Sequence, residues 1–198
     1  HSVERVLAEL RHISRELHVR NFMYWDDNFA VSQDRAIAIS RRMVEERLAL
    51  RYTVQIRADH VSRPLLDSLK ASGCQFAAIG VESGNETKLR EMGKHETNDD
   101  FRRAIALMRQ VGLPSIASYI LGLPGDTHET IRETMDFAFE LNADQSKFMI
   151  LAPYPGTAVY RMAQERGLVR PDDFAQLEAL NYYDTVAINL SQVPDTDL

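Results

Sequence analysis

Residues 76–84 read FAAIGVESG, an apolar run that leads without a polar break into Glu82, Ser83 and Gly84. A strand with one solvated face alternates apolar and polar residues, whereas a strand covered by helices on both faces is apolar throughout. Residues 115–121, SIASYIL, are nearly as apolar and lead into GLPGDT at 122–127. The two segments predict a parallel sheet in an α/β fold, where ligands bind at the carboxyl ends of the strands.

The rest of the chain alternates between amphipathic helical segments and short extended runs. Apolar residues recur at helical spacing over residues 3–17. The further elements expected are helices near 34–50, from 63, and from about 97, 126 and 157, and strands near 21–25, 52–57 and 146–151. With the two central segments this makes five strands and six main helices, an alternation typical of parallel sheets.

Local end signals support these helices. Thr97 with Asp100, and Asp126 with Glu129, have the spacing of a capping box. The glycines placed to end helices are Gly73, Gly112 and Gly167. A complete eight-unit barrel takes about 250 residues, so five units predict either a partial (β/α) TIM-like barrel or a doubly wound sheet. A repeat that opens on a helix is expected to lack its first strand.

Composition limits the class of protein. The chain has 198 residues, 44% of them hydrophobic, which is enough for one domain with a core. Its net charge of −6 argues against a broad grip on nucleic acid, and no stretch has the length of a membrane span. The single cysteine, Cys74, has no partner for an internal disulfide. We therefore expect a cytoplasmic protein with a small-molecule ligand.

Charged side chains follow three of the predicted strands. Asp26 and Asp27 are a carboxylate pair that suits an amine or a metal ion, although aspartates at such positions also cap helices. Arg57 lies two residues before Asp59, and such a pair is commonly a solvated salt bridge. Glu82 follows an apolar run directly, so its carboxylate needs a partner. Glu82 is the strongest candidate for a ligand contact.

The later strands end in glycine and proline. GLPG at 122–125 allows close backbone approach to a flat ligand but is also common turn chemistry, and PYPGT at 153–157 stiffens another strand exit. The six histidines lack ligand-like spacing, so we interpret them as surface or capping residues. Met23, Tyr24 and Trp25 are interpreted as core packing.

Taken together, five motifs resemble those of the radical S-adenosylmethionine (radical SAM) superfamily, most closely its cobalamin-associated branch. They are WDDNF (25–29), QIRAD (55–59), IGVESG (79–84), YILGLPGDT (119–127) and ILAPYPGT (150–157). The resemblance extends from about Ser2 to Gly167. It implies a partial six-stranded barrel whose first strand leads into a CxxxCxxC loop that holds a [4Fe-4S] cluster. It also implies reductive cleavage of S-adenosylmethionine to a 5′-deoxyadenosyl radical.

The resemblance assigns cofactor-binding residues one at a time. Asp26 and Asp27 would hold the methionine amino group of S-adenosylmethionine, and Arg57 and Glu82 with Ser83 would lie near its ribose and carboxylate. The residues expected to border adenine are Ile120, Gly122 and Leu151. No catalytic residue or metal ligand is identified in this chain.

The resemblance also sets the expected domains and partners. Residues 1–170 would form a radical SAM barrel with strands 2 to 6, and residues 171–198 a C-terminal extension that packs under the barrel or leads to a further domain. The chain lacks the CxxxCxxC loop. We therefore expect a fragment, inactive alone, of an enzyme whose cluster ligands, and any cobalamin domain, lie outside it. The unpaired edge near residues 22–25 predicts self-association. Substrate and reaction type stay open.

Two other classes of function use the same features. Asp27, Asp59 and Glu82 on successive strand ends would form an all-oxygen Mg²⁺ site, as in enolase-like barrels, although that reading needs a catalytic Lys or His on a later strand. A barrel-derived binding module without catalysis would explain the missing cysteines by loss.

Overall fold

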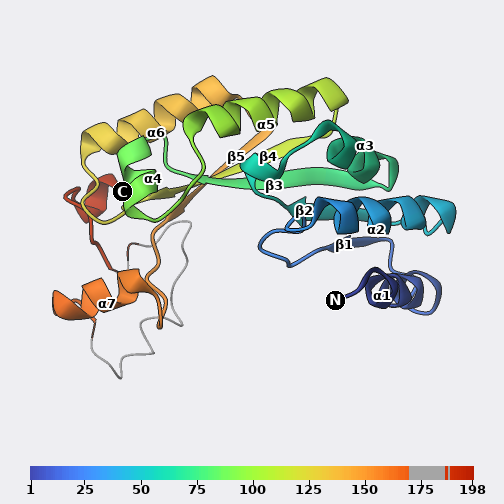
Figure 1. Cartoon of the computed structure of the whole chain (residues 1–198). Helices are drawn as coiled ribbons and strands as arrows, with labels where there is room; N and C mark the ends of the chain where they lie inside the picture. Colours follow the sequence, from blue (N-terminus) through green and yellow to red (C-terminus); the bar gives the residue numbers. More distant parts are fainter. Residues whose placement is uncertain (170–185, 187) are drawn as a thin grey trace. The chain divides into compact units, whose positions relative to one another are not determined.

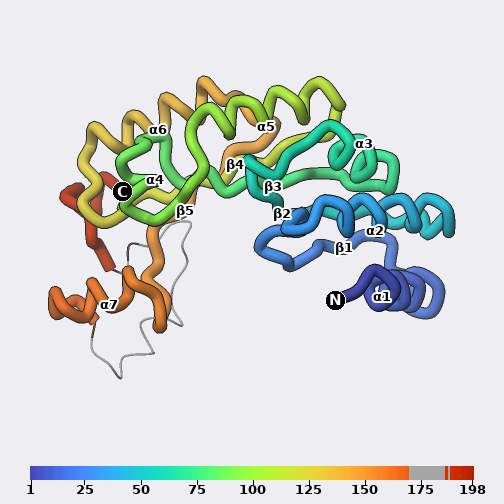
Figure 2. The backbone as a smooth tube through the Cα atoms, viewed as in Figure 1, coloured from blue at the N-terminus to red at the C-terminus, as the bar shows by residue number. Residues whose placement is uncertain are grey.

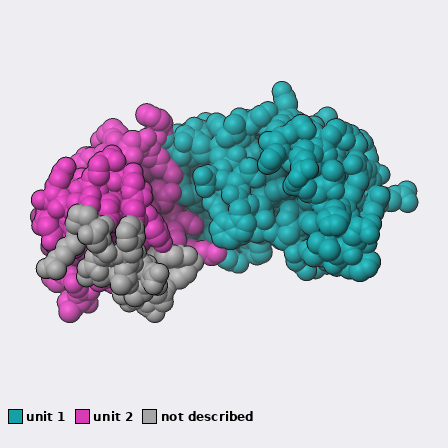
Figure 3. All heavy atoms as spheres, turned by 90° about the horizontal axis from the view of Figure 1, so that it is seen from below, with its two compact units in different colours: residues 1–80, 96–117, 141–145 teal, residues 81–95, 118–140, 146–198 magenta. Residues whose placement is uncertain are grey.

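A computed structural model of the chain describes residues 1–169, 186 and 188–198 (Figure 1). The chain forms two compact units (Figure 3). Unit 1 comprises residues 1–80, 96–117 and 141–145, and unit 2 comprises residues 81–95, 118–140 and 146–198. Part of the predicted C-terminal extension, residues 171–185 and 187, lies outside the described residues, and the predicted boundary at residue 170 stays a prediction.

Five strands form one sheet in the order β1-β2-β3-β4-β5, so each strand neighbours the next in sequence. The strands are β1 (Asn21–Met23), β2 (Arg51–Gln55), β3 (Cys74–Glu82), β4 (Ser115–Leu121) and β5 (Gln145–Ile150). β1 pairs with β2, and β2 with β3, in parallel. This sequential order confirms the predicted fold class of a partial, parallel (β/α) barrel.

Unit 1 contains four α-helices, one before β1 and three between successive strands. They are α1 (Val3–Arg15), α2 (Gln33–Glu45), α3 (Arg63–Ala71) and α5 (Asn98–Val111). Helix α2 contacts α1 on one side and α3 on the other, and α3 contacts α5 (Figures 1 and 2). A serine side chain caps the amino end of α1, α2 and α3, and Thr97 with Asp100 forms the predicted capping box of α5.

The core of unit 1 explains where its chain must turn. Tyr52 on β2 is 2% exposed, and its hydroxyl lies 2.6 Å from the Ser72 hydroxyl at the end of α3. Gly73 follows with φ +102, and a side chain there would overlap the carbonyl of Leu50. Only glycine meets both conditions, so the predicted helix stop is also the close approach that lets β3 begin beside β2.

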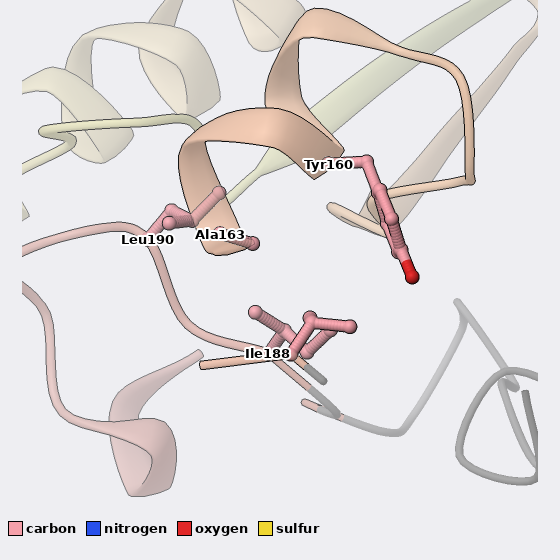
Figure 4. Packing of buried hydrophobic residues seen from close by; sticks show 5 residues of the cluster. Tyr160, Ala163, Ile188 and Leu190 are labelled. Atoms are coloured by element: carbon pink, nitrogen blue, oxygen red, sulfur yellow. The ribbon is translucent and has the colours of Figure 1, made fainter. Parts of the chain in front are cut away.

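Among the described residues of unit 2, the α-helices are α4 (Glu86–Glu91), α6 (His128–Leu141, whose last residue belongs to unit 1) and α7 (Ala158–Glu165). Thr157 caps α7 through its side chain, which accepts from the Tyr160 N–H. A small core forms where α7 meets the chain near residue 190 (Figure 4). Its buried members are Tyr160, Ala163, Val169, Ile188 and Leu190.

Three expectations differ from the structure. The predicted helix over 34–50 ends at Glu45, because Arg47 and Ala49 adopt left-handed φ values of +52 and +51. Helix α4 was not predicted, since its six residues are too few to show periodicity. The capping box of α6 is formed by Thr127 and Thr130 and not by Asp126 and Glu129, because Asp126 turns back into its own loop. Among the described residues, no helix combines the length and the apolarity that a membrane crossing needs.

Candidate functional site

Two free carboxylates follow β1 in unit 1. Asp26 and Asp27 are exposed, and within the described residues neither makes a hydrogen bond or ion pair. Their neighbour Trp25 is 83% exposed, so its assignment to the core was wrong, whereas Tyr24 packs against Phe29 with ring centroids 4.5 Å apart. The aromatic anchor is therefore Tyr24, and the segment after it presents an indole and two carboxylates to solvent.

Asn28 ties the end of β1 to the end of β2, a role that the sequence did not indicate. Its Oδ1 accepts from the Ala30 N–H at 3.2 Å and from the Arg57 N–H at 3.4 Å. With Oδ1 so engaged, Nδ2 faces His60 Nδ1 at 3.0 Å and donates to it. The Asn28 contacts thus make His60 Nδ1 the acceptor and leave Nε2 as the ring donor, with the side chain 34% exposed.

Arg57 is held by two carboxylates at the end of β2. Its Nε and Nη2 donate to Asp59 at 3.0 and 2.7 Å, which raises the pKa of Arg57 and lowers the pKa of Asp59. Its Nη2 also lies 3.7 Å from Glu96, whose side chain is 1% exposed. Glu96 accepts from the Ala58 N–H at 2.6 Å and so fixes the turn that carries Arg57.

Sequence reasoning missed Glu96, because it comes from the loop before α5 and carries no local signal. Glu96 is buried although it belongs to no strand and no motif, so only the folded structure shows what it contacts. Arg57 and Asp59, in contrast, form the salt bridge that their spacing indicated.

Glu82 ends β3 and belongs to unit 2. Its φ of +68 is one of five left-handed values at non-glycine residues among those described. Such a conformation costs about 1 to 2 kcal/mol, and the other four residues lie in segments that follow helices, whereas Glu82 ends a strand. Glu82 Oε1 accepts from Lys94 Nζ at 3.2 Å, with side chains 21% and 16% exposed. Lys94 is thus the partner that the Glu82 carboxylate was expected to need, and the left-handed backbone sets the direction in which the carboxylate leaves the strand.

The residues after Glu82 are hydrogen-bonded to α6 within unit 2. Ser83 is 1% exposed, and its hydroxyl lies 3.1 Å from the Thr134 hydroxyl and accepts from the Asn85 N–H at 3.1 Å. Gly84 donates its N–H to Thr134 Oγ1 at 3.1 Å. The Ser83 hydroxyl therefore supports the strand exit, and its predicted contact with ribose or carboxylate stays a prediction.

The GLPGDT loop is organised by a buried carboxylate. Asp126 is 3% exposed, accepts from the Leu123 N–H and the Thr130 hydroxyl at 2.8 Å each, and has its pKa raised by burial. Gly122 is buried with φ +80. The loop is thus rigid, and the predicted adenine-bordering residues Ile120 and Gly122 lie at and just beyond the end of β4.

A cavity of about 630 Å³ lies beside this loop in unit 2. Its walls come from the end of α4, the loop, Leu151 and α7, and apolar side chains predominate. They include Met92, Leu123, Pro124, Leu151, Val159 and Met162. Leu151 follows β5, and its N–H donates to the carbonyl of Leu121 at 2.9 Å. A volume of this size suits a small organic ligand.

The same side chains are poorly suited to bind a metal ion. Within the described part of the chain, no three His, Cys, Asp or Glu side chains gather in a way that could hold an ion. Asp59 is paired with Arg57 and Glu82 with Lys94, so two of the three carboxylates of the alternative Mg²⁺ site already have cationic partners. His60 and His128 each contact a polar side chain, Asn28 and Asp197 respectively, at 3.0 Å.

Cys74 does not suit an iron–sulfur cluster. It is the first residue of β3, at the strand end opposite to Glu82, and is 5% exposed. Burial raises the pKa of its thiol to about 12, so the thiolate that a cluster requires is disfavoured. A single thiol could in any case supply only one cluster ligand.

Comparison with known proteins gives concordant results. The profile of the Radical SAM superfamily matches residues 1–138. An uncharacterized methyltransferase, PH0819, of Pyrococcus horikoshii is 32% identical over 85% of this chain, and bacteriochlorophyllide d C-8(2)-methyltransferase of Chlorobaculum tepidum is 26% identical over 81%. This chain spans 37% and 36% of these two relatives.

A solved structure has the same fold. The radical S-adenosylmethionine methyltransferase TsrM of Kitasatospora setae, with cobalamin and a [4Fe-4S] cluster bound, superposes with a TM-score of 0.73 and 23% identity. The superposition covers 83% of this chain and 32% of TsrM. The matched region is therefore a minor part of a larger protein in each of these cases.

Proposed function

Because the chain belongs to the radical SAM superfamily, we propose that it forms the S-adenosylmethionine-binding part of a radical SAM enzyme of the cobalamin-associated branch. The observation that carries this proposal is Glu82, a partly buried carboxylate held at a strand end by a backbone φ of +68. Strain of this kind persists where the site has a use for it.

Residues at the ends of β1 and β2 suit the amino acid end of the ligand. Asp26 and Asp27 are ionisable acceptors without partners among the described residues, as an incoming ammonium requires. Arg57 is oriented by Asp59 and Glu96 and offers a guanidinium to a carboxylate or to ribose oxygens. These residues would bind and orient the ligand.

Residues at the ends of β3, β4 and β5 suit the nucleoside end. Glu82 and Ser83 would lie near the ribose and carboxylate, and Ile120, Gly122 and Leu151 would border adenine through backbone groups and apolar contacts. Support comes from the buried, left-handed Gly122 and from the apolar cavity to which Leu151 contributes. A base at Gly122 would have to replace the Leu198 side chain, whose methyl carbons lie 3.3 and 3.7 Å from a Cβ built at this glycine.

The chemistry supplied by bound S-adenosylmethionine would be reductive cleavage of its C5′–S bond to a 5′-deoxyadenosyl radical, or a related radical or methyl transfer step. The electron would come from a [4Fe-4S] cluster whose thiolates lie outside this chain, since Cys74 does not fit that role. The residues of this chain would only bind and orient the ligand.

The proposal extends to partners and location. The cluster, and any cobalamin, would be held by a preceding part of the same protein, and residues 171–198 would form a C-terminal extension. The low-potential cluster favours the reducing cytoplasm. β1 pairs on one side with β2 and stands at the end of the strand order, so its other edge would mediate self-association in the chain alone. Light scattering that shows a monomer at every concentration would refute this last point.

The test of the proposal is a single-turnover assay of the complete, anaerobically reconstituted enzyme. Incubation with S-adenosylmethionine and a strong reductant should yield methionine with 5′-deoxyadenosine, or S-adenosylhomocysteine if methyl transfer occurs. Asp26→Asn and Asp27→Asn should each reduce the yield, whereas the exposed Asp136→Asn on α6 should not. A reconstituted cluster with no cleavage of the ligand would overturn the proposal.

A further inference from the structure

A second cavity, of about 430 Å³, lies in unit 1 at the amino-terminal ends of β1 and β2. The residues that line it come from the end of α1, the approach to β1, and the segment between α2 and β2. They are Ser14, Arg15, His18, Arg20, Glu46, Arg47, Leu48 and Ala49. This end of the strands is opposite to the one where Asp26 and Arg57 lie, so the cavity is separate from the proposed cofactor site.

Three arginines line this cavity without a carboxylate partner. Within the described residues, the side chains of Arg15 and Arg47 make no hydrogen bond or ion pair, and Arg20 Nη1 donates only to Ser14 Oγ at 3.2 Å. Ser14 is 4% exposed, and its hydroxyl donates to the Leu48 carbonyl at 3.1 Å. Arg20 is therefore oriented by a neutral, rigid partner, and its charge is not compensated.

The one carboxylate in the lining does not neutralise these arginines. Glu46 accepts from Arg11 at 2.6 and 2.7 Å and from Arg42 at 3.0 Å, and neither of those arginines lines the cavity. Their hydrogen bonds lower the pKa of Glu46 to about 2. The negative charge of Glu46 is thus satisfied outside the cavity, in a chain whose net charge is −6.

We propose that this cavity is an anion site that binds a small phosphate-bearing molecule between Arg15, Arg20 and Arg47. Guanidinium groups match phosphate oxygens with paired, charge-assisted hydrogen bonds. The volume is in the range of small-molecule pockets, and an anion would pair with three exposed arginines that have no carboxylate partner among the described residues. Nucleic acid is the less favoured occupant, because the chain as a whole is acidic.

A competing explanation is that Arg15 and Arg47 serve only the carboxyl ends of α1 and α2. Cations near a helix carboxyl end interact favourably with its dipole. That role affects stability and not ligand binding, whereas the proposed site affects both. Arg41 on α2 provides the matched control, because it is exposed and its side chain makes no hydrogen bond or ion pair among the described residues.

The test is calorimetric titration of the 198-residue chain with pyrophosphate at 50 mM salt, alongside thermal melts. We expect saturable binding that Arg47→Ala and Arg20→Ala each weaken by about tenfold or more, and that Arg41→Ala leaves unchanged. Arg47→Lys should recover part of the affinity. A short single-stranded RNA should bind no more tightly than pyrophosphate.

Three results would overturn the proposal. The first is no saturable binding of pyrophosphate by the wild-type chain. RNA binding without pyrophosphate binding is a case of this first result and would make nucleic acid the occupant. The second is an equal loss in Arg41→Ala, which would indicate diffuse attraction to surface charge. The third is a lower melting temperature in Arg47→Ala with unchanged affinity, which would assign the arginine to the helix end. None of these outcomes depends on whether the enzyme cleaves S-adenosylmethionine.

Discussion

Substitution of Gly84 by alanine should separate β3 from α6 and disturb Glu82, two residues away. A Cβ at Gly84 would lie 2.6 Å from Phe137 Cβ, 2.7 Å from the Glu133 carbonyl oxygen and 2.9 Å from Thr134 Cα. Two of these atoms are helix backbone, so no side-chain rotation relieves the overlap. The helix or the strand exit must move by several tenths of an ångström.

The magnitude follows from the contacts. Overpacking of this kind costs about 1 to 3 kcal/mol. Movement of α6 also weakens the hydrogen bonds from Gly84 N–H and the Ser83 hydroxyl to Thr134, at about 1 kcal/mol each. The lower chain entropy of alanine in the unfolded state returns about 0.4 to 1 kcal/mol. The net loss is about 3 kcal/mol, or a decrease in melting temperature of about 6 to 12 °C in a chain of this size.

Gly93→Ala is the matched control for Gly84→Ala. Gly93 has φ +73 but no heavy atom within 4 Å of a built Cβ, so alanine there meets only backbone strain. That strain costs about 1 kcal/mol, or about 2 to 4 °C. Thermal and urea unfolding followed by circular dichroism would compare the two variants. If Gly84→Ala melts no lower than Gly93→Ala, the packing argument fails.

Three further predictions concern charge and metal chemistry. Glu46→Gln should lower stability by about 1 kcal/mol at pH 7, since these ion pairs are partly solvated. The difference in stability between the wild type and Glu46→Gln should shrink as pH falls from 4.5 towards about 2. The pKa of Glu46 is lower in the folded than in the unfolded chain, so protonation removes the stability that its carboxylate contributes. Urea unfolding at several pH values measures this difference. Glu96→Ala should cost about 1 to 3 kcal/mol because it orphans the buried Ala58 N–H, and Glu96→Gln should recover most of the loss in the same assay. The chain alone should stay colourless after anaerobic incubation with iron and sulfide, because Cys74 is its one thiol; stoichiometric iron with absorbance near about 400 nm would contradict this.

Apolar runs and helix signals were enough to predict a parallel α/β sheet, whereas the resemblance was needed to favour a partial barrel over a doubly wound sheet. Residues 115–121 form β4 with the predicted bounds, and β3 (Cys74–Glu82) contains the apolar run at 76–81. Strands buried on both faces have few alternatives once glycines and caps bound them. The predicted helix boundaries that were wrong depend on local hydrogen bonds. Asp126, for example, bonds within its own loop and does not cap α6, and a run of polar residues does not show which of them forms the cap.

The candidate site was predictable only in part. Residues that leave a strand directly, such as Glu82 and Arg57, are visible in the sequence because polarity changes abruptly there. Glu96 and Lys94, which hold them, come from a loop whose composition is unremarkable and whose position depends on the tertiary fold. Trp25 was misplaced because an aromatic residue beside a strand is usually buried, whereas here it follows the strand and faces solvent.

The most direct test of the central claim is the affinity of the complete, reconstituted enzyme for S-adenosylmethionine when Glu82 is changed. A hydrogen bond to a charged group is worth about 1.5 to 3 kcal/mol, so Glu82→Ala should weaken binding by roughly tenfold to hundredfold in calorimetric titration, and Glu82→Gln by less. The exposed Glu129→Ala on α6 should bind as the wild type does. Unchanged affinity of Glu82→Ala, with a lower melting temperature, would reduce Glu82 to the ion-pair partner of Lys94 and contradict the account.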